Sequence, residues 1–77
     1  MNAARRKELQ KALDLMEQAK SILETIKDEE QECFDNMTEG LQATERGQQI
    51  ESNASDLESA YGELESIVDS FTDIIER

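Results

Sequence analysis

The second half of the chain repeats apolar residues at alternating steps of three and four, and this spacing limits the possible folds most strongly. The series comprises Ile50, Ala54, Leu57, Tyr61, Leu64, Val68, Phe71 and Ile75. Such steps place side chains on one stripe of an α-helix and are typical of a coiled-coil seam. Because the 77 residues include no proline, nothing interrupts a helix of about seven turns here.

The first half carries a matching series that predicts a second long helix. Its members are Leu9, Ala12, Met16, Ala19, Leu23, Ile26, Glu30, Cys33 and Met37. Asn2 is suited to cap the start of the first helix, and Thr44 to cap the start of the second. Gly40 is suited to a left-handed stop between the two helices. The sequence therefore predicts helices over about 3–37 and 45–76, joined by a turn over about 38–44.

A turn this short predicts an antiparallel helical hairpin, so we expect an all-α fold with a single helical-hairpin domain over 1–77. With the centre of the turn near Leu41, facing residue numbers add to 83 or 84. This register places the small residues Ala12 and Ala19 opposite bulky side chains, as a packed core requires. It also places Glu30 opposite Ala54, and Cys33, as a small buried residue, opposite Ile50.

Further apolar residues flank these two seams and widen the apolar stripe beyond what a two-helix seam needs. They include Leu13, Leu15, Ile22, Phe34, Ala60, Ile67 and Ile74. A lone hairpin would leave much of this stripe in water, and a large exposed apolar patch usually marks an interface. We expect a homodimer that forms a four-helix bundle. A hairpin docked on a different protein is the alternative, and an unpartnered hairpin is the minor case.

The composition argues against enzymatic and metal-dependent functions. The chain has no histidine and one cysteine, so the commonest general base and the usual zinc ligands are missing. The acidic run 28–32 fans around a helix and is expected to be solvated. We therefore predict no catalytic residues, no metal site and no cofactor, and the single cysteine fits a reducing cytoplasm.

The apolar runs are too short for a membrane span. The longest of them contain two residues, such as Ile22-Leu23, so we expect neither a transmembrane helix nor a signal peptide and no membrane partner. A net charge of −11 argues against direct binding of nucleic acid.

The charge is unevenly distributed along the chain. Residues 28–76 hold 15 acidic side chains against one basic residue, whereas residues 1–27 are mildly basic. The candidate contacts for an anion or an acidic partner are Arg5, Arg6, Lys7, Lys11 and Arg46. In an antiparallel dimer of hairpins, the basic start of one chain could approach Arg46 of the other and form a composite anion site.

Carboxylates of the second helix form a candidate acidic partner face. Its members are Glu51, Asp56, Glu58, Glu63, Glu65, Asp69 and Asp73. Such a face either mimics the phosphates of DNA toward a DNA-binding protein or only confers solubility.

The central segment 28–53, which reads DEEQECFDNMTEGLQATERGQQIESN, resembles a group of small acidic proteins encoded by phages, prophages and other mobile elements. Ala4-Arg5-Arg6 also fits the group, whereas Thr38 stands where members often have proline. The resemblance implies a phage or prophage accessory protein in the cytoplasm of a bacterial host, where it would bind a host or defence protein.

Three functions follow as hypotheses. The first is a non-enzymatic accessory protein that acts by protein–protein binding and inhibits a host or defence component. The second is a DNA-mimic inhibitor of a DNA-binding enzyme. The third is a protein that sequesters an anionic small molecule at its basic residues.

Overall fold

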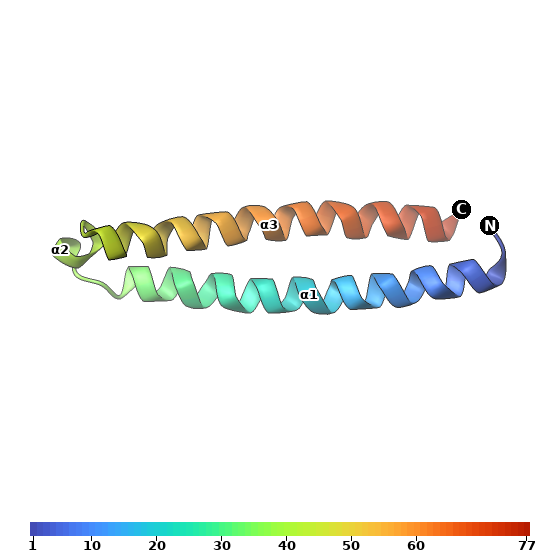
Figure 1. Cartoon of the computed structure of the whole chain (residues 1–77), viewed down its shortest axis with the longest axis horizontal. Helices are drawn as coiled ribbons and strands as arrows, with labels where there is room; N and C mark the ends of the chain where they lie inside the picture. The colour runs from blue at the N-terminus through green and yellow to red at the C-terminus, as the bar shows by residue number, and fades with distance from the viewer.

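Two long helices lie side by side in opposite directions and are joined by a single short helix, in a computed structural model that describes all residues 1–77 (Figure 1). Helix α1 spans Ala3–Asp35, α2 spans Glu39–Gln42 and α3 spans Glu45–Glu76. Both chain termini lie at the same end of the hairpin, opposite α2 (Figure 1). The predicted all-α, hairpin-like fold is therefore confirmed.

Side-chain caps start the two long helices where the residue types predict them. Oδ1 of Asn2 accepts a hydrogen bond from the backbone N–H of Arg5 at 2.8 Å, and Oγ1 of Thr44 accepts one from Gly47 at 3.1 Å. Each cap satisfies a backbone donor that has no partner within the helix. The observed start of α3 matches the prediction, whereas α1 ends two residues earlier than predicted, at Asp35.

The turn is built differently from the prediction. Gly40 is not a left-handed stop, because no glycine of the chain has a positive φ and Gly40 lies inside α2. Thr38 explains the difference: its Oγ1 accepts from the backbone N–H of Leu41 at 3.4 Å and restarts a helical turn. The chain thus reverses through two consecutive N-caps rather than through a left-handed residue.

Close backbone packing holds this turn against α3. Gly47 is buried, and a Cβ atom built on it would lie 2.7 Å from the carbonyl oxygen of Gln42 and closer still to that of Leu41. Nε2 of Gln42 donates to the carbonyl oxygen of Phe34 at 3.0 Å, and Nε2 of Gln48 donates to that of Gln42 at 2.9 Å. These bonds connect the end of α1, the turn and the start of α3.

The helices pack in the predicted register, but α1 is rotated relative to the prediction. Contacts between Glu30 and Asn53 and between Glu24 and Tyr61 confirm that facing residue numbers add to about 84. However, Ala19, Ile26 and Cys33 of the predicted seam are exposed. The residues that follow them are instead partly buried between the helices; these are Lys20, Lys27 and Phe34.

This rotation corrects several individual predictions. Cys33 is exposed rather than buried, and Glu30 bonds to Asn53 rather than facing Ala54 alone. Leu13, expected in a dimer interface, is one of the most buried residues of the hairpin itself, and Phe34 is half-buried. The long side chains at positions 20, 27 and 34 fill the space between the helices better than Ala19 could.

The hairpin is a thin rod with a small core. It measures 58 × 14 × 14 Å, and its radius of gyration is 17.3 Å, compared with about 11.5 Å for a compact domain of this length. Its buried apolar residues are Leu13, Ala54 and Val68. No helix of the chain combines the length and the apolar character needed to cross a membrane.

Candidate protein-binding face

An open groove runs between α1 and α3 on one side of the hairpin. One stretch of it is lined by Ile26, Glu30, Asn53, Asp56 and Leu57. The adjoining stretch toward the turn shares Glu30 and Asn53 and adds residues that include Cys33, Arg46, Gln49 and Ile50. We call the residues that pack between the two helices, such as Lys27 and Ala54, the interhelical positions. In both helices the residue directly before an interhelical position faces the groove, as Ile26 and Asn53 do.

Positions seven residues apart share a helix face, so this side can be followed along both helices. On α3, Asn53 is succeeded at this spacing by Ala60, Ile67 and Ile74. On α1, the same side carries an apolar stripe that reaches Ile26. We name these residues the apolar face: Ala12, Leu15, Ala19, Ile22, Ile26, Ala60, Ile67 and Ile74.

The large members of the apolar face are open to solvent. Leu15 is 65% exposed, Ile22 59% and Ile67 46%. Two predicted dimer residues, Leu13 and Phe34, pack within the hairpin instead, while Ile74 is partly covered. The structure therefore brings four of the six predicted dimer residues onto one side of the rod.

The opposite side of the rod is polar, and from Gln10 onward the charged residues exposed on it are acidic. One lysine from between the helices reaches this side, since Nζ of Lys27 lies 3.7 Å from Oδ1 of Asp28. The acidic residues directly follow the interhelical positions in both helices. We name them the acidic face: Asp14, Glu17, Glu24, Asp28, Asp35, Glu51, Glu58, Glu65, Asp69 and Glu76. The hairpin thus separates an apolar side from an acidic side, a division that the sequence analysis did not find.

The predicted acidic partner face is split by this arrangement. Asp56 lines the groove beside the apolar face, and Glu63 follows it at the spacing of seven. Glu51, Glu58, Glu65 and Asp69 belong to the acidic face, and Asp73 lies on the outer edge of α3. The acidic residues of α1 were not predicted as part of this face, although they too directly follow the interhelical positions.

The predicted basic residues do not form one site within the chain. Arg5, Arg6, Lys7 and Lys11 are all exposed near the open end of the hairpin, and Lys11 pairs with Glu8 at 3.1 Å. Arg46 lies at the turn end, about 50 Å away along a helix of this length. Within a single hairpin, this separation does not favour sequestration of a small anion.

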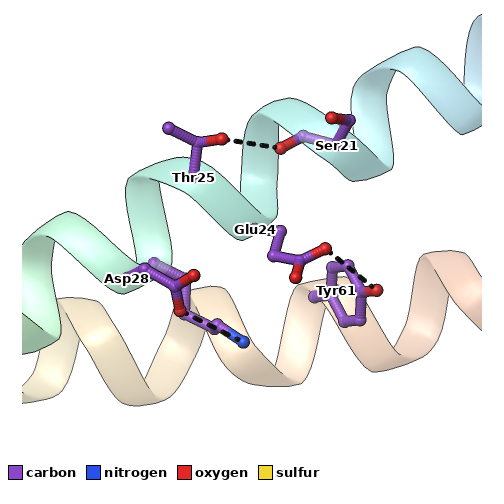
Figure 2. A network of polar contacts seen from close by, with 6 residues as sticks. Ser21, Glu24, Thr25, Asp28 and Tyr61 are labelled. Carbon is purple, nitrogen blue, oxygen red and sulfur yellow. Dashed lines mark hydrogen bonds and ion pairs between the residues drawn. The ribbon is translucent and has the colours of Figure 1, made fainter.

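Tyr61 occupies the centre of the interface between the long helices. The Nζ atoms of Lys20 and Lys27 lie 5.5 and 5.2 Å from the centre of its ring. Its hydroxyl donates to Oε2 of Glu24 at 3.4 Å (Figure 2). Lysine stems and a tyrosine ring therefore occupy the layer in which apolar side chains of α1 were predicted.

No group of three or more histidine, cysteine or carboxylate side chains is placed to hold a metal ion. Comparisons with protein-family models, with curated proteins and with solved structures found no match for this chain. The resemblance to proteins of phages and mobile elements therefore stays a prediction.

Proposed function

We propose that this chain is a non-enzymatic protein-binding protein that works as a homodimer, with two hairpins joined through their apolar faces into a four-helix bundle. The observation that carries the proposal is the apolar face itself, an uncovered stripe along both long helices. Apolar stripes of this width are typical of bundle helices rather than of two-helix seams.

The exposed area is large enough for an interface with a second copy. A compact folded chain of 8.8 kDa exposes about 4,800 Å², whereas the hairpin exposes 5630 Å². The excess of about 800 Å² is close to the area that each partner buries in an interface of standard size, about 800 Å². Face-to-face packing would also leave both acidic faces directed outward, where water and counterions solvate the carboxylates.

Sedimentation equilibrium tests the dimer. We expect the chain at tens of micromolar to sediment with twice its 8.8 kDa mass. Ile22→Glu should weaken the association more than tenfold, because it places a charge in the centre of the apolar face. Ser21→Glu adds the same charge on the neighbouring exposed position and should leave the dimer intact. A wild-type chain that stays folded and monomeric would overturn the proposal.

The resemblance to phage and prophage proteins supports a host or defence protein as the target of the dimer. The acidic faces are the surface that remains for such a partner. Affinity capture from a bacterial lysate should recover one protein with the wild type and lose it with Glu58→Gln/Glu65→Gln. Recovery of the same proteins by both chains would remove the acidic face from the proposal.

A second candidate function is mimicry of DNA, and the row of carboxylates along the acidic face of both long helices favours it. A basic DNA-binding enzyme would then bind this face in a salt-sensitive manner. Added duplex DNA should displace the chain from such an enzyme, and binding that persists in excess DNA would speak against mimicry.

A further inference from the structure

We propose that the two hairpins pack with their turns at opposite ends of the bundle, and that the twofold axis passes beside Ile67 of both copies. This arrangement rests on the proposed homodimer and specifies its geometry. It also predicts an ion pair between Arg5 of one copy and Glu29 of the other.

The distribution of charge along the rod favours opposite ends. The turn end, residues 28–51, carries eight acidic residues and one basic residue. At the open end, the bases of residues 1–11 lie beside the acids of residues 65–77, and the two segments nearly cancel. Turns at the same end would bring two strongly negative regions within a Debye length of about 8–10 Å. Turns at opposite ends place each negative region beside a region of almost no net charge.

The apolar face of α3 determines the register, because it is symmetric about Ile67. Ala60 and Ile74 lie seven residues to either side, so a twofold axis at Ile67 pairs Ala60 of one copy with Ile74 of the other. Ile67 then packs against its own counterpart. A small residue faces a large one at both outer layers, as a well-packed core requires.

The same axis gives a matching pattern on α1. The numbers of facing residues on α1 and α3 add to about 84. An axis beside Ile67 of α3 therefore passes α1 at the level between Leu15 and Ala19. Leu15 then faces Ala19 of the second copy, and Ala12 faces Ile22. Close to the axis, both helices therefore alternate large and small side chains, although their sequences are unrelated.

Charged residues at the edges of the apolar face select this register over its neighbour. Arg5 lines a shallow groove with Glu8 and Leu9 at the open end of the hairpin, on the α1 stripe that also contains Glu29. In the proposed register, Arg5 faces Glu29 of the second copy, and Ile26 faces Glu8 at the edge of the apolar face. A shift by one heptad in one direction would instead place Ala12 against Glu29 and bring Glu63 close to its own counterpart, which is unfavourable for like charges. A shift in the other direction would place Arg5 against Ile22 and lose the ion pair.

Disulfide trapping tests the arrangement. In a Cys33→Ser background, Ile67→Cys should form a covalent dimer under mild oxidation, because both thiols lie at the twofold axis. Glu65→Cys in the same background lies on the acidic face and should stay monomeric in a non-reducing gel. With turns at the same end, the two copies of position 67 would lie diagonally across the bundle and would not react.

A charge exchange tests the ion pair independently. Arg5→Glu should raise the dissociation constant of the dimer about tenfold, since each bundle contains two such pairs. The double variant Arg5→Glu/Glu29→Arg should restore it. If the chain sediments as a dimer but neither forms the disulfide at position 67 nor responds to the charge exchange, this arrangement is wrong. The proposed function would then be unaffected. A chain that sediments as a monomer would overturn both.

Discussion

At the residue scale, Gly47 is the position where the turn depends most on the absence of a side chain. Its Cβ position is occupied by backbone atoms of Leu41 and Gln42, which cannot move aside as a flexible side chain could. We expect Gly47→Ala to destabilise the hairpin by about 2–3 kcal/mol. Urea denaturation followed by circular dichroism measures this loss.

Gly62 provides the matched control, because it has the same substitution in open surroundings. A Cβ on Gly62 meets nothing within 4 Å, and the residue is exposed in the middle of α3. Gly62→Ala should therefore stabilise the chain by about 0.5–1 kcal/mol through helix propensity. If both alanines have the same effect on the midpoint of denaturation, the close approach at Gly47 is not the cause.

Residue type alone predicted the local features that depend on one side chain and its neighbours. Asn2 and Thr44 cap the helices as expected because an N-cap needs only a suitable oxygen and a free N–H. Gly40 was misassigned because Thr38, two residues earlier, begins a new turn of helix. The need for glycine at position 47 arises from the folded turn lying on α3, and no local pattern indicates it.

At the scale of elements, the length and register of the helices followed from the sequence, whereas the rotation of α1 did not. The α1 sequence offers two adjacent heptad series, one through Ala19 and Ile26 and the other through Lys20 and Lys27. Counting apolar residues favours the first. The second is selected because long lysine stems pack around Tyr61, a contact between helices that hydrophobic periodicity ignores. The same error hid the division into apolar and acidic faces.

Substitution of Tyr61 tests this explanation for the rotation. Tyr61→Leu keeps an apolar side chain but removes the ring between Lys20 and Lys27, and we expect a loss of about 1 kcal/mol of stability. Tyr61→Phe keeps the ring and loses only the hydroxyl bond to exposed Glu24, so it should be nearly neutral. Thermal unfolding of the three chains compares them. Equal stability of the leucine and phenylalanine variants would show that the lysines do not depend on the ring.

At the scale of the whole molecule, the net charge of −11 acts against a rod that places acidic residues on both long helices. Salt screens this repulsion. We expect an increase in sodium chloride from about 20 to 200 mM to raise the melting temperature by about 5 °C. A variant with three acidic-face charges removed, Glu58→Gln/Glu65→Gln/Asp69→Asn, should respond less. A melting temperature that falls with salt would instead show that attractive ion pairs dominate.

The dependence of the melting temperature on protein concentration connects the small core of the hairpin to its apolar face. Leu13, Ala54 and Val68 are a small buried set for 77 residues, so we expect much of the stability to come from the second copy of the proposed homodimer. Mass action then stabilises the folded dimer by about 1.4 kcal/mol for each tenfold increase in concentration. We expect a rise of about 3–5 °C per decade in the wild type. For Ile22→Glu, which we expect to dissociate into monomers, the melting temperature should be lower and should not change with concentration. If the wild-type melting temperature is equally constant, the hairpin is stable alone and its apolar face is free for a different protein.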